Sequence, residues 1–310
     1  MQPTDVSWLW QPRIAIGKLT LLCGDPGEGK SFLTLDIAAR VSRGFMWPDG
    51  SGNAPLGSVV LLCGEDDIAD TVRPRLDMAE ADPSKIVALR GVRTVDSEGG
   101  YCRDVDLQRD LDIIEAAIVK TPDCKLFIVD PIGCYLGETD SHNNSEVRKV
   151  LAPLSEMASR LGVAALAVHH FRKGDGSAKH RVTGSLAFTA AARAVWAVTG
   201  DKRDETGRRK LFVCVKNNIG VDQSGLAFQL HSTFRDSVPS IAWEESPIDI
   251  SADEALTTTR KQPGPEAYSS NRVCRCSTTP AIRRSIPATE AFAAKRPCDS
   301  SSGSTSHTAE

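Results

Sequence analysis

The chain has 310 residues, of which 41% are hydrophobic and 25% are charged, and its formal net charge is −3. This composition suits one sizeable α/β core with a small appendage. It excludes a protein that is basic throughout and coats nucleic acid by bulk electrostatics, so any nucleic-acid contact must be local.

Targeting and cysteine patterns favour a cytoplasmic protein. The first 13 residues lack the apolar run of a signal peptide, and no window approaches the roughly 18 apolar residues of a membrane span. Four of the nine cysteines lie in or beside apolar runs, where a reduced thiol behaves as a small hydrophobe: Cys23, Cys63, Cys124 and Cys214. We therefore expect a cytoplasmic location and no membrane contact.

Short apolar runs alternate with amphipathic stretches, which is typical of repeated βα units around a mostly parallel, buried sheet. The clearest helix is predicted over residues 145–162, with Ser145 as its N-cap and a kink at Pro153. The predicted strands cover residues 19–23, 59–63, 126–130, 163–168, 194–198 and 211–215.

The first predicted strand is followed by GDPGEGKS, residues 24–31, a full match to the phosphate-binding motif G-x-x-x-x-G-K-[ST]. Its glycines let backbone N–H groups point at phosphate oxygens, and the helix predicted over residues 32–41 adds its positive dipole end. Lys30 should reach the β- and γ-phosphates, and the Ser31 hydroxyl should bind Mg²⁺. The predicted ATP-binding residues are Gly24, Asp25, Pro26, Gly27, Glu28, Gly29, Lys30, Ser31 and Phe32.

Carboxylates follow the next two strands, at the sheet edge where α/β proteins bind ligands. Glu65, in the sequence GEDD, can accept a proton from the attacking water or orient it. Alternatively, Glu65 with Asp66 and Asp67 only favours the start of the following helix. Asp130 can hold Mg²⁺ through its water shell, or it can simply start a turn before Pro131.

The fourth predicted strand ends in two histidines and leads into a basic loop. His170 can hydrogen-bond the γ-phosphate and report its loss to that loop; a purely structural histidine is the alternative. The loop, residues 171–185, is rich in glycine and carries four basic residues and one acidic residue. We predict that it contacts single-stranded DNA through phosphates, with a solvent loop as the alternative and residues 137–144 as a weaker second candidate.

The last part of the chain has a different character. After about residue 256 the sequence shows neither a helical nor a strand period and is rich in Ser, Thr and Pro. We expect residues 251–310 to be a disordered or aberrant tail, and we hypothesise that the reading frame is lost near residue 267.

Six segments in this order resemble the RecA-like ATPases of the RepA type, the hexameric replicative helicases of plasmids that are related to DnaB and occur in phages. The segments are GDPGEGKS, GEDD, LFIVDP, AVHHFRKG, RVTGSLAFTAAARAVW and VCVKNNIG, and the likeness covers residues 14–235. The resemblance implies a RecA-like P-loop fold: a mostly parallel twisted sheet with helices on both faces and antiparallel strands on the C-terminal side. We expect the chain to divide into an N-terminal linker (1–15), an ATPase domain (16–250) and the tail.

The resemblance also implies roles for single residues. Lys30 and Ser31 act at the phosphates and Mg²⁺, Glu65 is the catalytic carboxylate, Asp130 binds Mg²⁺ and His170 is a sensor. Arg193 is a finger that reaches the site of a neighbouring subunit in a hexameric ring, with Lys216 assisting; neutralising charge on the γ-phosphoryl group in this way makes hydrolysis depend on assembly. Solvated or structural positions are the alternatives for Arg193 and Lys216.

The function predicted from the sequence is ATP hydrolysis by a DNA helicase or DNA-dependent ATPase. Alternatives are a RecA-like ATPase that serves repair or regulation without translocating, and a binding module whose nucleotide sets only its oligomeric state. A small-molecule P-loop kinase is disfavoured, because the chain offers no obvious lid or substrate subdomain.

Overall fold

The computed structural model describes residues 5–256, apart from 97–98, 142, 172–185, 222–223 and 233–237. These residues all lie in one compact unit, Met1–Arg260. The predicted DNA-contacting loop, beyond Phe171, and the predicted tail, beyond Leu256, lie outside the described residues.

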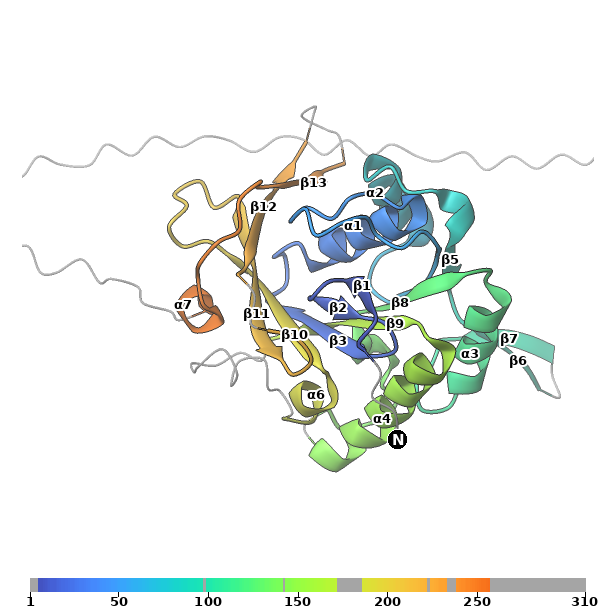
Figure 1. Cartoon of the computed structure of the whole chain (residues 1–310). Helices are drawn as coiled ribbons and strands as arrows, with labels where there is room; N and C mark the ends of the chain where they lie inside the picture. Colours follow the sequence, from blue (N-terminus) through green and yellow to red (C-terminus); the bar gives the residue numbers. More distant parts are fainter. Residues whose placement is uncertain are drawn as a thin grey trace, which may run out of the picture. The chain divides into compact units, whose positions relative to one another are not determined.

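A nine-stranded sheet runs through the described part of this unit, in the order β13-β12-β11-β10-β3-β9-β8-β4-β5 (Figure 1). Neighbouring strands from β10 to β5 pair in parallel, and those from β10 to β13 pair antiparallel. The prediction of a mostly parallel α/β sheet is confirmed. The strands are β3 (Leu19–Gly24), β4 (Ser58–Cys63), β5 (Ile86–Leu89), β8 (Cys124–Asp130), β9 (Ala164–His170), β10 (Ala194–Gly200), β11 (Arg209–Asn217), β12 (Leu226–His231) and β13 (Ser240–Trp243).

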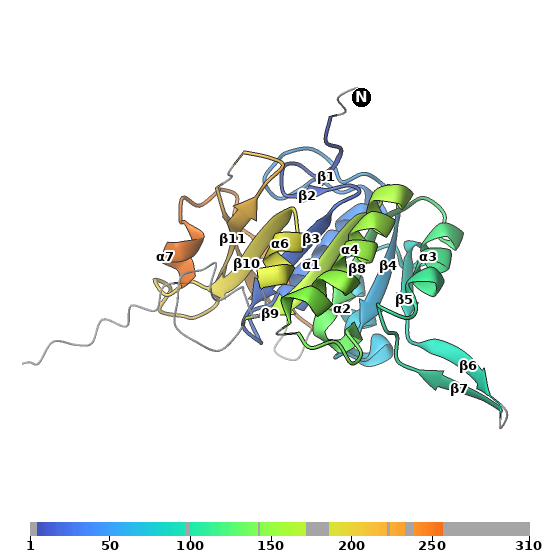
Figure 2. The ribbon, with the colours of Figure 1, turned by 90° about the horizontal axis from the view of Figure 1, so that it is seen from below.

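Helices cover both faces of the sheet, which explains why its central strands are apolar at nearly every position. Along β3, Leu21 packs on one face and Leu22 on the other. The face of Leu21 is covered by α3 (Leu111–Lys120), α4 (Asn144–Leu161) and α6 (Leu186–Ala191), and the face of Leu22 by α1 (Lys30–Arg43) and α2 (Arg73–Met78) (Figures 1 and 2).

The N-terminal segment is part of the packed body, so its assignment to a linker is corrected. Strands β1 (Trp8–Trp10) and β2 (Ile14–Ala15) pair antiparallel. The Trp10 side chain is fully buried and its ring stacks on Trp47, with 4.7 Å between the ring centroids. Two indole rings bury a large apolar area together, which fixes this segment against the sheet.

Two other boundaries differ from the prediction. Residues Ala252–Leu256, assigned to the tail, form α7, and Leu256 is buried in the core. Helix α4 is capped by Asn143, whose Oδ1 accepts a hydrogen bond from the Ser145 backbone N–H, so Ser145 is not the N-cap. Asn143 and Ser145 are both good capping residues, and the sequence does not say where the helix begins.

The remaining elements lie around the sheet. Strands β6 (Val92–Asp96) and β7 (Gly99–Arg103) form a hairpin that extends away from it (Figure 2). Short helical turns cover Ile68–Val72, which is π-helical, and also Pro83–Lys85 and Ile132–Tyr135. None of the described helices has the length and apolar character needed to span a bilayer.

Candidate active site

The loop of residues 24–31 joins the carboxyl end of β3 to α1, and two of its glycines stand where a side chain would clash or strain the backbone. A Cβ at Gly24 would lie 2.4 Å from the Val198 carbonyl oxygen of β10, so only glycine fits there. Gly29 directly precedes α1 and has a φ of 90°, a backbone conformation that residues with a side chain rarely adopt. Together they bring the first turn of α1, with its free N–H groups, to the sheet edge.

Lys30 begins α1 and is buried beneath the loop, with 5% of the residue exposed. Its Nζ donates to the carbonyl oxygens of Gly24, at 2.9 Å, and Asp25, at 2.8 Å. Burial lowers the pKa of the ammonium group, and the nearby Asp130 carboxylate opposes that shift. The cation is therefore held at the carboxyl end of β3, next to a buried acid.

Asp130 is the last residue of β8 and is also buried. Its Oδ2 accepts a hydrogen bond from Thr34 Oγ1 at 3.1 Å, and the Ser31 hydroxyl donates to the same carboxylate. Burial raises the pKa of Asp130, whereas these hydroxyls and Lys30 lower it. A second positive charge beside this carboxylate would favour its ionised form.

The donors around Asp130 fit Mg²⁺. They are oxygens, which this ion prefers, and it typically takes one or two protein oxygens while keeping water and phosphate oxygens in its other positions. Asp130 and Ser31 would be the residues that hold it. Among the described residues, no group of three or more His, Cys, Asp or Glu forms a site made by protein alone.

Glu65 and His170 face each other from two other strands. Glu65 follows β4, His170 ends β9, and His170 Nε2 lies 3.5 Å from Glu65 Oε1. Nδ1 of the same imidazole is buried and has no hydrogen-bond partner among the described residues. The sheet order β3-β9-β8-β4 explains why these groups lie close together. It places the loop, His170, Asp130 and Glu65 at the carboxyl ends of successive neighbouring strands.

These groups line one cavity of about 220 Å³. Of the nine residues predicted to bind ATP, Gly24, Asp25 and Glu28 do not line it. Glu28 instead forms an ion pair with Lys210 of β11, at 2.9 Å, and so ties the loop to the antiparallel half of the sheet. The lining residues are Pro26, Gly27, Gly29, Lys30, Ser31, Phe32, Glu65, Asp66, Arg75, Asp130, His170 and Leu230.

Arg75 is the charged lining residue that the sequence did not reveal. Its guanidinium carbon lies 4.4 Å from the Phe32 ring centroid, and its Nη1 donates to Asp66 Oδ2 at 2.6 Å. Asp66 is therefore not simply a charge at a helix start, whereas Asp67 does cap the following turn by accepting from the Ala69 backbone N–H. Arg75 lies in an ordinary helical pattern, and no sequence signal marked it.

Arg193 and Lys216 lie at the other end of the central strands. The Arg193 backbone N–H donates to the carbonyl of Leu19, the first residue of β3, whereas the phosphate-binding loop follows the last residue of that strand. Lys216 Nζ donates to the carbonyl oxygens of Thr189 and Ala192, at 2.6 and 2.8 Å, and so caps the end of α6. Neither residue lines the cavity of its own chain.

A family model described as an AAA domain matches residues 1–176. The matched range includes the loop, Glu65, Asp130 and His170, and it ends before Arg193. No curated protein matches the chain.

Proposed function

Because the chain belongs to the AAA domain family and is thus an ATPase of the P-loop type, we propose that it is a cytoplasmic motor with a RecA-like fold, a DNA helicase or DNA-dependent ATPase of the RepA type. One observation carries the proposal. Four neighbouring strands bring the phosphate-binding loop, an acid suited to Mg²⁺, a carboxylate and an imidazole to one cavity.

The chain's own residues have distinct parts in ATP hydrolysis. The N–H groups of the loop and the Lys30 ammonium bind the phosphates, and Ser31 and Asp130 hold Mg²⁺. When bound, Mg²⁺ neutralises charge on the phosphate oxygens. Glu65 orients a water and accepts its proton, a part that suits an exposed carboxylate at the cavity mouth.

His170 couples the nucleotide to the segment that follows it. Its Nε2 lies 3.5 Å from Glu65 Oε1, so a change at the catalytic carboxylate acts directly on the imidazole. The basic loop 171–185 starts at the next residue, which gives a short covalent link from the sensor to the proposed DNA contact. Its net positive charge suits phosphate contacts that do not depend on sequence.

A ring of subunits would complete the site. Arg193 lies at the opposite end of β3 from the loop, so it can serve only the cavity of another subunit. An arginine supplied in this way stabilises charge on the γ-phosphoryl group and links turnover to assembly. We propose a homo-oligomer, a hexamer by the resemblance to RepA-type helicases.

Phosphate release measured with and without single-stranded DNA, together with the native mass, tests the function. We expect turnover that DNA stimulates and a hexameric mass. Lys30→Ala should reduce turnover by roughly 10²-fold or more, because it removes the cation at the phosphates. Lys125→Ala, a partly exposed lysine of β8 paired with Asp123, is the matched control and should leave turnover unchanged.

Other outcomes separate the alternatives. Turnover that ignores DNA would contradict the motor and indicate a regulatory ATPase. Nucleotide binding without turnover would indicate a module whose nucleotide sets its assembly state. Full activity in Lys30→Ala would contradict the site itself.

A further inference from the structure

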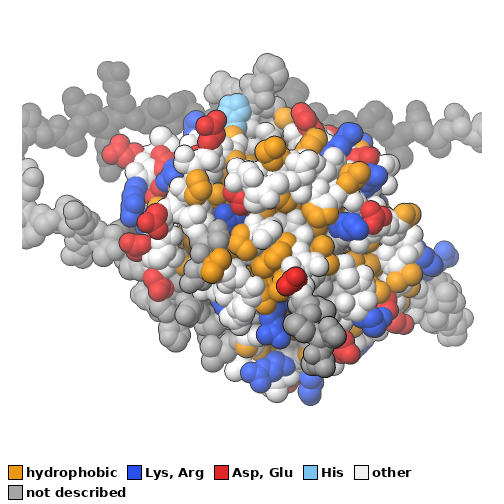
Figure 3. Space-filling model, in the orientation of Figure 1, with side chains coloured by type: hydrophobic (Ala, Val, Ile, Leu, Met, Phe, Trp, Pro, Cys, Tyr) orange, Lys and Arg blue, Asp and Glu red, His pale blue; other side chains and the backbone are white. Residues whose placement is uncertain are grey.

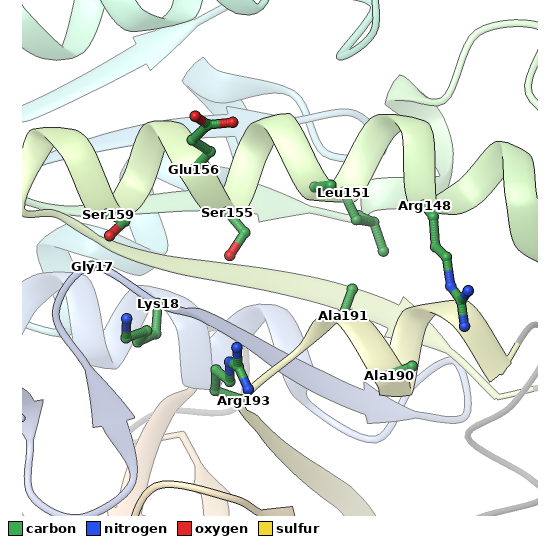
Figure 4. Close-up of a pocket in the computed structure, with 11 residues that line it drawn as sticks. Gly17, Lys18, Arg148, Leu151, Ser155, Glu156, Ser159, Ala190, Ala191 and Arg193 are labelled. Carbon is green, nitrogen blue, oxygen red and sulfur yellow. The ribbon is translucent and has the colours of Figure 1, made fainter.

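A second cavity, of about 600 Å³, lies between α4, α6 and the segment that enters β3. Gly17 and Lys18 precede β3, Arg193 precedes β10, and α4 contributes Arg148 (Figure 4). Gly17, Lys18 and Arg193 therefore lie at the amino ends of two parallel strands, β3 and β10. The cavity is thus separate from the proposed ATP site, which lies at their carboxyl ends.

Three cations border this cavity, and no described residue forms an ion pair with any of them: Lys18, Arg148 and Arg193. The Glu156 carboxylate also borders it but points away from Lys18 and Arg193 in Figure 4. Figure 3 shows Lys and Arg side chains gathered over α4 and α6 at the lower edge of the face drawn. The cavity therefore carries an excess of positive charge, which favours an acidic partner.

An exposed acidic segment of matching charge lies at the other end of the sheet. It follows β4 and contains Asp67 and Asp70, both exposed. The described hydrogen bonds of their carboxylates come from backbone N–H groups and from the Thr71 hydroxyl, and none comes from a cation. Within one chain this segment lies at the carboxyl ends of the strands and the basic cavity at their amino ends, so the two can meet only between two copies.

We propose that the basic cavity is the docking site for this acidic segment of a second copy of the chain, with Lys18 and Arg148 facing Asp67 and Asp70 of the other molecule. The inference rests on the proposed function in one respect, namely that the protein assembles. Each copy offers one acidic and one basic surface, so the contact is head-to-tail and closes into a ring when the rotation allows it.

The same contact accounts for the position of Arg193. Arg193 borders the basic cavity, and Glu65 lies two residues before Asp67 of the acidic segment. Docking one surface on the other therefore brings Arg193 towards the ATP cavity of the neighbour. Exposed charge pairs contribute little affinity each, but they fix register and exclude wrong orientations.

Charge reversal with rescue tests the docking. The first variant, Lys18→Glu with Arg148→Glu, reverses the basic cavity. The second, Asp67→Asn with Asp70→Arg, reverses the acidic segment, and its asparagine keeps an oxygen for the cap at position 67. Native mass spectrometry and sedimentation with MgADP report assembly without any need for turnover.

We expect each variant alone to raise the dissociation constant of assembly at least about tenfold, because like charges then meet at the contact. The chain that carries all four changes should assemble again. Lys149→Glu, an exposed neighbour of Arg148 that does not line the cavity, is the matched control and should assemble like the wild type.

Three results would overturn the docking. The first is a wild-type protein that is monomeric, and the second is a four-change chain that stays dissociated. The third is a Lys18→Glu, Arg148→Glu variant that no longer binds a single-stranded oligonucleotide but keeps the native mass of the wild-type assembly. The last result would identify the cavity as a nucleic-acid site. Rescued assembly in a protein that does not hydrolyse ATP would support the docking while contradicting the proposed motor, so the two failures are distinguishable.

Discussion

At the scale of single residues, the two adjacent histidines of β9 show how strand geometry divides roles. Side chains alternate along a strand, so neighbours point to opposite sides. His170 faces Glu65 in the proposed ATP site, whereas His169 stacks on Phe188 with 4.2 Å between the ring centroids. The sequence shows both as a pair at a strand end, and only the packing of α6 tells that His169 lies against Phe188 and not in the proposed site.

The partly buried His169 should make the protein less stable in mild acid. Burial lowers the pKa of His169 to about 4, from an ordinary value near 6.5. Because the unfolded chain then binds the proton more readily, stability is lost as the pH falls from about 6.5 towards 4. The slope is about 1.4 kcal/mol per pH unit, a total of roughly 3 kcal/mol. Urea unfolding at a series of pH values measures it.

His169→Phe keeps an aromatic ring against Phe188 but has no proton to bind, so it should flatten the curve in this range. His231→Gln, at an exposed end of β12, is the matched control and should keep the wild-type slope. An unchanged slope in His169→Phe would show that another group causes the acid sensitivity.

At the scale of elements, the sequence predicted the central strands and missed the edges. The six predicted strands are all present, because two-sided burial makes them apolar throughout. The edge strands β5 and β13 are only four residues long, and β12, which pairs with β13, mixes apolar and polar residues. The N-terminal strands escaped prediction for another reason: their stability comes from contacts distant in the sequence, such as Trp10 with Trp47.

The N-terminal pair of strands should contribute strongly to stability. Trp10→Ala removes a fully buried ring that stacks on Trp47 and donates from its indole N–H to Asp49. A loss of about 3–5 kcal/mol is expected from urea unfolding. Trp8→Ala, in the same strand but only partly buried, is the matched control and should cost clearly less. Equal costs would contradict a core role for this segment.

At the scale of the whole molecule, much of the site was predictable, because a parallel sheet collects its strand ends at one edge. The loop, Glu65, Asp130 and His170 followed from that rule. Arg75 did not, since it returns to the cavity from a helix. No rule about a single chain could place Arg193 in this cavity, because it lies at the opposite edge of the sheet, and the part proposed for it needs a second subunit.

Mixing two inactive proteins should restore activity if Arg193 acts on a neighbour. Lys30→Ala lacks the phosphate-binding cation but keeps Arg193, and Arg193→Ala has the reverse defect. Each alone should lose hydrolysis, while Arg193→Ala still binds nucleotide. In a random one-to-one ring, roughly a quarter of the contacts join an intact Lys30 to an intact Arg193, so phosphate release should return to about that fraction of the wild type.

The control for this experiment is Lys30→Ala mixed with the double variant that carries both changes, where no contact can combine the two intact residues. That mixture should stay inactive, because both proteins carry Lys30→Ala and every ATP cavity therefore lacks its lysine. Activity in Arg193→Ala alone would instead show that Arg193 is an exposed residue at a strand start without a catalytic part. The basic cavity could then still hold subunits together, because the proposed docking depends on the charges of Lys18 and Arg148 and does not need Arg193 to take part in hydrolysis.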